Sequence, residues 1–476
     1  MGNKSTKADL VVIGAGPGGY TAAFLAADLG LAVTLVDPEA TPGGVCLHRG
    51  CIPSKTLLHA ARLIEDGKHA KAWGINFKAP AIDVRVLRSK TAQVVEQLTQ
   101  GLGQLCRQRN IEYIKGQARL IHSNAVTIVG PSNQSSTLEF EHAIIATGSS
   151  PVTLGTFEMG GARVMDSTVA LQLKTVPKRL LVIGGGYIGL ELGSVYGALG
   201  SEVTVVEMLP GLLWGVDGDL ARVLTRKLKS QFAAVYVNTK VVAAEKSRDG
   251  VQCRFANTDG ETMEQTFDRV IVAVGRRPRS ADLGLENTPV EIDDSGCIKT
   301  DAQKRTAAPH IFAVGDVTGQ PMLAHKASHE GRVAAEIIAG KEAVFEPRAI
   351  PAVVFTNPEI AWCGLTESEA QAQKRPFEVA RFPWAASGRA LTQGVTDGLT
   401  KIIVDPLSQR VLGMGIVGTG AGELIAEGVL AIEMAALASD LKMTIHPHPT
   451  LSETVMEAAE VFCGQSTHLY RPKKMR

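Results

Sequence analysis

A strand, glycine turn, helix and strand follow one another twice in this chain, and this repeat limits the fold more than any other feature. The matched residues are Gly14 and Gly184, Gly16 and Gly186, Gly19 and Gly189, and Asp37 and Glu207, each pair 170 residues apart. In such a unit the glycines allow a tight turn and a close backbone approach to a pyrophosphate, and the acid binds ribose hydroxyls. Because two copies lie in register, the sequence predicts an α/β protein with two Rossmann-like units, one dinucleotide for each.

The chain has 476 residues, enough for about three domains of ordinary size. Helical periodicity from Lys55 to Leu105 predicts one or two long helices after the first unit. Alternating strands after Ala349, followed by a single long helix from Ala421 to Ser439, predict a C-terminal α+β domain. The expected domains are residues 1–150, 151–278, 279–347 and 348–476.

Two cysteines, Cys46 and Cys51, lie in the segment GGVCLHRGCIPSK, directly after the first predicted nucleotide-binding strands. Five residues of regular helix span ~7.5 Å along the axis, more than the roughly 6.8 Å that a disulfide tolerates between Cα atoms. If the two are bonded, the segment must bend, and Gly50 is the residue able to do so. Unpaired core thiols and half of a metal site are the alternatives. No second pair of ligands at such spacing appears, so no metal is expected.

Further candidate ligand-binding residues lie where predicted strands end. The segment EFEHAIIATGSSP ends a strand at Thr147-Gly148, and DRVIVAVGRRPR ends the matching strand at Gly275. Asp316 follows the apolar strand HIFAVG, and ligands of such sheets bind at the carboxyl ends of the strands. Ordinary buried strands with glycine ends and a solvated turn acid are equally compatible with each motif taken alone.

A histidine and an acid occur close together near the end of the chain, in TIHPHPTLSETVMEAAE. His448 precedes Glu453, in the first turn of a predicted helix, by five residues. A carboxylate that holds an imidazole makes a general base. The alternatives are a capping carboxylate with a surface histidine, and His446 as the base.

Composition and charge exclude several classes of protein. The net charge of +1 implies no polyelectrolyte partner. The seven cysteines are scattered, which argues against a secreted disulfide framework and favours a reducing compartment. No apolar run reaches the roughly 18 residues of a membrane span. The polar start matches a myristoylation pattern at Gly2, but a solvated lead into the first strand is the simpler interpretation. A bacterial cytoplasmic location is expected, with the mitochondrial matrix as the alternative.

Taken together, these segments resemble the flavoprotein disulfide reductases, and within them the dihydrolipoamide dehydrogenase family. The resemblance covers essentially the whole chain, through the motifs GAGPGG, GGVCLHRGCIPSK, ATGS, GGGYIGLE, GRRP, GDVTGQPMLAHKA, FPWAASGRA and HPHPTLSE. It implies FAD in the first unit, NAD in the second, a central domain that completes the FAD site, and dimerisation through the C-terminal domain.

The resemblance also implies roles for individual residues. Cys46 would be the thiol facing the substrate, and Cys51 the thiol facing the flavin. Lys55 would lie by the flavin, paired with Glu191, and His448 with Glu453 would act on the partner subunit's cysteines. The implied FAD-binding residues are Gly14, Gly16, Gly19, Asp37, Lys55, Gly116, Thr147, Gly148, Ser149, Asp316, Met322, Leu323, Ala324 and His325. The implied NAD-binding residues are Gly184, Gly186, Gly189, Glu191, Glu207, Val241 and Gly275.

The reaction implied by the resemblance is the oxidation of protein-bound dihydrolipoamide to lipoamide by NAD⁺, through a Cys46–Cys51 redox disulfide and FAD. This is the E3 role in 2-oxo acid dehydrogenase complexes, and the partners would be lipoyl domains of the acyltransferase or the glycine-cleavage carrier protein. Glu207 favours NAD over NADP, because a carboxylate repels a 2′-phosphate. The alternatives are a glutathione- or mercuric-reductase-like enzyme and a non-catalytic binding role. His48-Arg49 departs from the Asn-Val frequent in the family.

Overall fold

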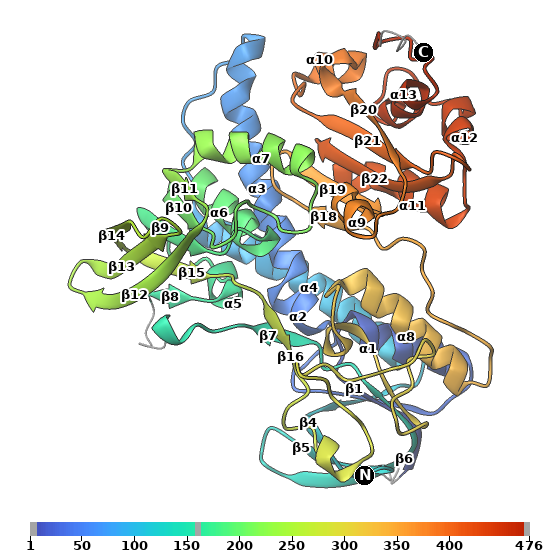
Figure 1. Cartoon of the computed structure of the whole chain (residues 1–476). Coiled ribbons are helices and arrows are strands. Elements are labelled where there is room, and N and C mark those ends of the chain that lie inside the picture. Colours follow the sequence, from blue (N-terminus) through green and yellow to red (C-terminus); the bar gives the residue numbers. More distant parts are fainter. Residues whose placement is uncertain (1–6, 158–162, 471–476) are drawn as a thin grey trace.

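The structure is a computed structural model that describes residues 7–157 and 163–470. Its first unit, which contains β1 and β6 at the bottom of Figure 1, is built on a parallel sheet. The strand order is β3-β2-β1-β6, with β17 added beside β6. A meander of β4 and β5 pairs with the first half of β6. The strands are β1 (Lys7–Ile13), β2 (Val33–Asp37), β3 (Glu112–Lys115), β4 (Gln117–His122), β5 (Ala125–Val129), β6 (Ser135–Ile145) and β17 (Ile311–Ala313).

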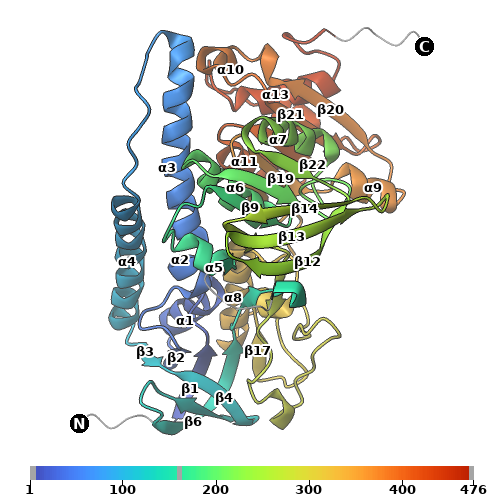
Figure 2. The same ribbon diagram turned by 90° about the vertical axis from the view of Figure 1, so that its left-hand side faces the viewer.

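Helices cover one face of this first sheet, and the β4–β5 meander with the segment that precedes β17 covers the other. Helix α1 (Pro17–Asp28) packs along α8 (Ala324–Ile338), which is contributed by a segment about 300 residues later in the chain. The Cys segment forms α2 (Gly44–Arg49) and α3 (Cys51–His69), followed by the short turn η1 (Ala70–Trp73) and α4 (Val84–Gln108). Two long helices therefore occupy the region where one or two were predicted. Figure 2 shows α3 and α4 running alongside each other.

The second unit repeats the arrangement. Its parallel sheet has the order β11-β10-β9-β15-β8, and β12, β13 and β14 form an antiparallel meander beside it. The strands are β8 (Val164–Met165), β9 (Arg179–Ile183), β10 (Glu202–Val206), β11 (Ala234–Tyr236), β12 (Thr239–Ser247), β13 (Gly250–Asn257), β14 (Thr262–Phe267) and β15 (Arg269–Val272), and the helices are α5 (Ser167–Leu171), α6 (Tyr187–Ala198) and α7 (Gly218–Gln231). A two-stranded ribbon, β7 (Ser149–Pro151) and β16 (Arg276–Pro278), joins the two units.

The central strands of both units are buried on both faces, which explains their sequences. In β1 the run from Leu10 to Ile13 is almost entirely inaccessible, as is the run from Leu180 to Val182 in β9. Each of these sheets packs against helices on one face and against an antiparallel meander on the other. Strands covered on both faces read as continuous apolar runs rather than as alternating ones. The α/β fold with two Rossmann-like units predicted from the sequence is therefore confirmed.

The C-terminal part is an antiparallel sheet in the order β18-β19-β22-β21-β20, covered by helices. Its elements are β18 (Ala352–Val354), β19 (Glu359–Gly364), α9 (Glu367–Ala372), β20 (Glu378–Pro383), α10 (Gly388–Gln393), β21 (Leu399–Val404), β22 (Val411–Gly418), α11 (Ala421–Glu433), α12 (Ala438–Met443) and α13 (Glu453–Phe462). Within the described ranges, no helix has the length and apolar character needed to cross a bilayer.

The prediction of a single helix from Ala421 to Ser439 is wrong. Helix α11 ends at Glu433, Ala435 adopts a left-handed conformation with φ 53°, and a separate helix, α12, starts at Ala438. The break has a tertiary cause, because the N–H of Val411 at the start of β22 donates to the Ala436 carbonyl, 2.9 Å away. Pairing with the sheet thus replaces the helical hydrogen bonds that the Ala-rich sequence would otherwise make.

A buried lysine ties the second unit to the C-terminal sheet. The Lys401 side chain is 1% exposed, and its Nζ lies 2.6 Å from Asp217, 2.8 Å from Asp219 and 2.7 Å from Glu367. Asp217 and Asp219 belong to the start of α7, whereas Glu367 starts α9. The three carboxylates converge closely enough to hold a cation, and the ammonium group of Lys401 is the cation that lies among them.

Replacing Lys401 by Met should lower the free energy of unfolding by about 3–5 kcal/mol, because three converging carboxylates would lose the charge that compensates them. Thermal unfolding followed by circular dichroism measures the effect. Lys341, an exposed lysine, supplies the control variant Lys341→Met. An unchanged midpoint in Lys401→Met would contradict the assignment of this cluster as a structural tie.

Candidate active site

The third position of the glycine motif in each turn can only be glycine, because it packs against the carbonyl oxygen of the first glycine. A Cβ atom on Gly19 would lie 1.8 Å from the Gly14 carbonyl oxygen, and one on Gly189 would lie 2.3 Å from the Gly184 oxygen. Both distances are far below van der Waals contact, so only glycine fits at either position. The first glycines, Gly14 and Gly184, have φ of 102° and 105°. The two turns therefore share one geometry.

The acid at the end of each second strand holds the turn beside it in the same way. Asp37 accepts hydrogen bonds from the N–H groups of Ala15 (2.7 Å) and Glu39 (2.9 Å). Glu207 accepts from Gly185 (2.6 Å) and Leu209 (2.8 Å), the positions 170 residues later. Burial raises the pKa of Asp37, and the two backbone N–H groups partly oppose this effect. Each acid thus fixes the glycine turn beside it.

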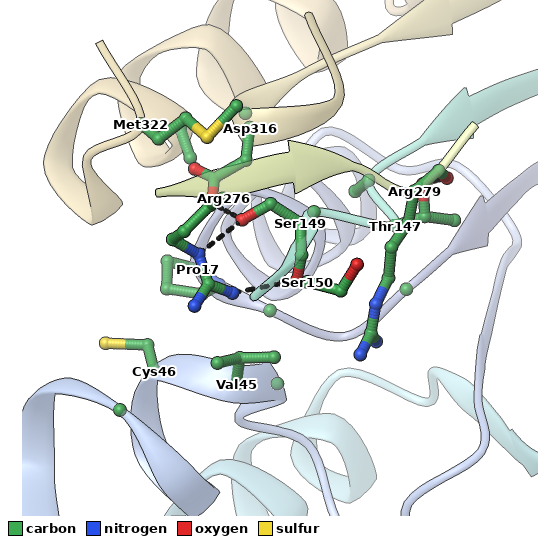
Figure 3. A pocket seen from close by; sticks show the side chains of 18 of the residues that line it. Pro17, Val45, Cys46, Thr147, Ser149, Ser150, Arg276, Arg279, Asp316 and Met322 are labelled. Carbon is green, nitrogen blue, oxygen red and sulfur yellow. Dashed lines mark hydrogen bonds between the residues drawn. The ribbon is translucent and has the colours of Figure 1, made fainter. Parts of the chain in front are cut away.

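A cavity of about 660 Å³ joins the first glycine turn to the two cysteines (Figure 3). It runs between the first unit, the β7–β16 ribbon and the start of α6. The residues singled out in the sequence that line it are Gly14, Gly16, Asp37, Cys46, Cys51, Lys55, Gly116, Thr147, Gly148, Ser149, Glu191, Asp316, Met322 and Ala324. The cavity thus gathers residues that are up to about 300 positions apart in the chain.

Three of the residues expected to hold FAD lie outside the lining of this cavity. Gly19 packs beneath the turn, against the Gly14 carbonyl. Leu323 caps the start of α8, and the His325 Nε2 lies 2.7 Å from the Pro351 carbonyl oxygen, so its ring faces the link to the C-terminal sheet. These three residues therefore lie behind the residues that line the cavity and support them from there.

The expected NAD residues lie on the second unit. Gly184, Gly186 and Gly189 form its turn at the start of α6, with Glu207 against it. Gly275 precedes β16 with φ 131°, and Val241 is half-buried on β12, where it packs against the core of the meander. Glu191 is the exception, because its side chain points from α6 towards the first cavity.

The two cysteines face one another because the chain bends between them. Cys46 lies in α2, Cys51 is the first residue of α3, and the intervening Gly50 has φ −140° and ψ −112°. A Cβ atom on Gly50 would lie 2.8 Å from the Val45 carbonyl oxygen. The bend expected at Gly50 is therefore present. Both cysteines are free thiols here, and their side chains hydrogen-bond to each other.

The surroundings of the thiols favour a thiolate at Cys51. Its hydrogen bond with Cys46 lowers the pKa of Cys51 to about 7, against an opposing effect of burial, and the nearby Lys55 ammonium also lowers it. For Cys46, the neighbouring Cys51 sulfur and then burial raise the pKa of the thiol. Because the thiolate is the reactive form in exchange and electron donation, the pair is chemically asymmetric.

A buried carboxylate, Glu191, connects this site to the rest of the molecule. Its side chain is 4% exposed and accepts hydrogen bonds from the Ser54 hydroxyl (2.9 Å), the Lys55 ammonium (2.8 Å) and the Phe355 N–H (3.0 Å). The Lys55 ammonium also lies 4.5 Å from the centre of the Phe355 ring. The pairing of Lys55 with Glu191 implied by the family resemblance is present, whereas the partners Ser54 and Phe355 were not predicted.

An arginine on the ribbon was also missed. Arg276 donates to the Ser149 hydroxyl (2.7 Å) and carbonyl (2.8 Å), and the same hydroxyl donates a short hydrogen bond to Asp316. Figure 3 shows Arg276 reaching Ser149, with Asp316 on one side and Cys46 on the other. Arg279 lines the same cavity, and burial followed by repulsion from Arg49 lowers its pKa. The arginines of the segment GRRPR were the available signal.

The turn that carries Asp316 is held by a second buried cluster. The turn N–H of Gly315 donates to Glu330, 2.7 Å away, and Glu330 is paired with Lys304 and Lys326 at 3.1 Å each. Glu330 is 1% exposed, so its charge is balanced by these two cations rather than by water. The carboxyl end of β17 is thereby fixed at the cavity.

His448 and Glu453 pair with each other but lie away from the cysteines. The His448 Nδ1 lies 2.8 Å from Glu453 Oε1, and Oε2 of Glu453 accepts from the Thr450 N–H at 2.7 Å. The pair sits at the start of α13, well separated from α2 in both Figure 1 and Figure 2. Among the described residues, the cavity lining contains none from the C-terminal sheet and its helices. His446 is instead buried against Glu427, 2.8 Å away.

Burial raises the pKa of Glu453, but the Thr450 N–H and the nearby His448 outweigh it, so the pKa of this carboxyl lies below its ordinary value. Glu453 is therefore ionised at neutral pH and can hold the His448 ring by its Nδ1–H. The side chain of His448 is 75% exposed, so its Nε2 is open to a neighbouring molecule. The carboxylate thus holds the imidazole on one side and leaves its other nitrogen facing solvent.

The fold and this site together define a dinucleotide-dependent disulfide oxidoreductase, and the comparisons with known proteins agree. The sequence model of the pyridine nucleotide-disulphide oxidoreductase family matches residues 8–331, and that of the family's dimerisation domain matches residues 350–459. The chain belongs to the pyridine nucleotide-disulphide oxidoreductase family.

Comparison with individual proteins gives more specific similarities than the family model does. The chain is 46% identical over 474 residues to a dihydrolipoyl dehydrogenase of Vibrio parahaemolyticus, which covers 100% of this chain and 99% of that protein. It is 45% identical over 471 residues to one of Haloferax volcanii, with 98% and 99% covered. The crystal structure of LpdA from Mycobacterium tuberculosis superposes with a TM-score of 0.88 at 27% identity, covering 96% and 99% of the two chains.

Alkylation of the reduced enzyme should report the asymmetry of the thiol pair. Because the pKa of Cys51 is about 7, the rate at which iodoacetamide modifies Cys51 should rise with pH through a midpoint near that value. Peptide mass spectrometry assigns the modified residue. Cys253 and Cys363 serve as internal controls, since burial raises the pKa of each to about 12. A Cys51 midpoint above that of an ordinary thiol would contradict the lowered pKa.

Proposed function

We propose that this protein is a dihydrolipoamide dehydrogenase, which oxidises dihydrolipoamide on a carrier protein to lipoamide and reduces NAD⁺. The observation that carries the proposal is the thiol pair of Cys46 and Cys51 at one end of the dinucleotide cavity, with Cys51 poised as a thiolate beside Lys55. The similarity to named dihydrolipoyl dehydrogenases along the full chain supports the same choice.

The residues around the first cavity fit FAD. The three-glycine turn, the Asp37 carboxylate at the ribose position and the arginines Arg276 and Arg279 suit a pyrophosphate-containing dinucleotide. The cavity then continues to the cysteines, where a ring system would contact sulfur. Residues 1–150 and 279–347 would together hold FAD, and residues 151–278 would hold NAD through the turn at Gly184. When bound, FAD supplies two-electron transfer between the dithiol and the nicotinamide.

Glu207 supports NAD over NADP as the acceptor. Its carboxylate stands at the end of β10 beside the second turn, where a 2′-phosphate would be repelled. Met208, Leu209 and Pro210 follow it, so the sequence provides no cation there. A glutathione- or mercuric-reductase-like activity is correspondingly disfavoured.

The thiol chemistry follows from the asymmetry of the pair. In the oxidised enzyme a substrate thiolate attacks the Cys46 sulfur of the Cys46–Cys51 disulfide, forming a mixed disulfide and releasing Cys51 as a thiolate. Lys55 stabilises that thiolate. The second substrate thiol, deprotonated by a histidine, attacks the substrate sulfur of the mixed disulfide. Lipoamide leaves, and Cys46 retains the electron pair and takes up a proton.

The histidine must come from a second copy of the chain. Within one protomer His448 and Glu453 lie away from the cysteines, yet the imidazole is exposed and directed outward. The adjoining surface carries exposed apolar side chains, Leu430 (63%), Met434 (72%), Met443 (76%) and Ile445 (95%), as an interface requires. The match of residues 350–459 to the family's dimerisation domain supports a homodimer with residues 348–476 at its interface.

The protein partners would be lipoyl domains of an acyltransferase core or of the glycine-cleavage carrier, because these present the dihydrolipoyl group. A cytoplasmic location stays a prediction from the sequence.

A direct assay tests the proposed function. The enzyme should reduce NAD⁺ with dihydrolipoamide and should not oxidise NADPH with glutathione disulfide. Cys46→Ser and Cys51→Ser should each lower dihydrolipoamide-dependent turnover by at least about a thousandfold, since neither exchange nor electron donation can be completed. Cys463→Ser, a half-exposed thiol outside the cavity, is the matched control and should keep full activity. Full lipoamide activity in either active-site variant would refute the scheme.

Subunit complementation tests the origin of the base. Cys46→Ser and His448→Gln should each be inactive as homodimers. When the two are coexpressed, about one quarter of the sites should combine an intact Cys46 with an intact His448 from the neighbouring chain. Activity recovered to about that level supports the arrangement across subunits. No recovery, although mixed dimers are isolated by two affinity tags, would show that the base acts within its own chain.

A further inference from the structure

A second cavity lies between the helical hairpin of α3 and α4 and the second unit. It adjoins the dinucleotide cavity, with which it shares two lining residues, Arg49 and Leu171. It has a volume of about 970 Å³ and is bounded by α2, the start of α3, one face of α4 and the end of α5. Small-molecule sites usually have volumes of about 300–1,000 Å³. None of the residues to which the proposed reaction assigns a chemical role lines this second cavity.

The rim of this cavity is cationic. Arg49, Arg85, Arg88, Lys174 and His48 line it, against a single carboxylate, Glu96. Arg49 is paired with Glu39 at 2.6 Å, and Arg85 with Asp83 at 3.4 Å. Glu96 accepts a hydrogen bond from Gln100 at 2.9 Å. Within the described parts of the chain, Arg88 and Lys174 have neither a hydrogen bond nor an ion pair, so their two positive charges are uncompensated.

The floor of the cavity has a different character from its rim. Leu171, 9% exposed, and the partly buried Val95 present the apolar surface of the floor, and Leu57 (1%) and Leu173 (0%) are packed behind it. An apolar floor beneath a cationic rim suits a molecule with one flat or apolar part and one anionic part. The rim comes from two parts of the fold, since Arg88 lies on α4 of the first unit and Lys174 follows α5 of the second.

We propose that this cavity is a binding site for a nucleoside diphosphate, with its phosphates at Arg88 and Lys174 and its base on the leucine floor. A guanidinium binds phosphate oxygens in pairs, and an ammonium adds a point charge. Arg88 also lies near the N-terminal end of α4, where the helix dipole favours an anion. The ligand would bridge the two dinucleotide units. It would also lie beside Arg49, the last residue of the helix that carries Cys46.

The test is calorimetric titration of the flavin-loaded dimer with ADP, in the presence of saturating NAD⁺ so that the second glycine turn is filled. One additional ADP per protomer should bind, more weakly as ionic strength rises. The variant Arg88→Gln/Lys174→Gln should bind ADP at least about tenfold more weakly. Lys78→Gln/Lys341→Gln removes the same charge from exposed positions elsewhere and should bind as the unmodified enzyme does.

Two further probes separate the parts of the ligand. Inorganic pyrophosphate should bind more weakly than ADP, because it leaves the apolar floor unused. Adenosine should bind without the salt dependence. Equal affinity of ADP for the cavity variant and the control variant, equal affinity of pyrophosphate and ADP, or no ADP binding at millimolar concentration would each overturn the proposal. None of these outcomes depends on dihydrolipoamide turnover, which is measured separately.

Discussion

The contact on which this architecture depends is the buried carboxylate of Glu191. Its three donors come from different parts of the chain: Ser54 and Lys55 on α3, and Phe355 beside β18. A carboxylate that is 4% exposed would cost several kcal/mol without partners, roughly the cost of breaking a buried ion pair. The donors of these hydrogen bonds lie on the first unit and beside the C-terminal sheet, whereas Glu191 lies on the second unit. The carboxylate therefore has all its partners only when the three parts are assembled. The same contact places Lys55 next to Cys51, so the assembly of the fold and the chemistry of the thiol have a common origin.

Charge compensation at buried positions recurs throughout the molecule. Lys401 is surrounded by three carboxylates where α7 meets the C-terminal sheet, and Glu330 is balanced by two lysines at the end of β17. Each cluster lies at a junction between segments distant in sequence. Apolar burial is non-directional, whereas buried charges require their partners at hydrogen-bonding distance and in suitable orientation. These clusters therefore fix the relative positions of the units that together form the cavity.

The two copies of the duplicated unit differ in the structural role of the segment that follows the glycine turn. In both copies the acid accepts two backbone N–H groups from equivalent positions, so the local geometry is retained. The first turn opens into a cavity that continues to the cysteines, because α2 and α3 follow its second strand. In the second copy, α6 carries Glu191 into the first cavity. One local structure thus supplies a binding turn in one copy, and both a turn and a supporting side chain in the other.

Much of this could be predicted from the sequence because it depends on local patterns. The two glycine turns, the acids 170 residues apart, the buried strands and the bend at Gly50 follow from steric limits and periodicity that act within about thirty residues. The partnership of Lys55 with Glu191 was available only through the family resemblance. Arg276 and Phe355 were missed, since nothing in the sequence beside either residue indicates a partner more than a hundred positions away.

The sequence by itself determined the two dinucleotide-binding units and the presence of a reactive cysteine pair, because backbone sterics and side-chain spacing act locally. Only the tertiary structure decided that α11 stops at Glu433, that β17 joins the first sheet, and that His448 lies apart from the cysteines of its own chain. Those outcomes depend on hydrogen bonds and buried charges between distant segments, whose free energy exists only once the segments have met.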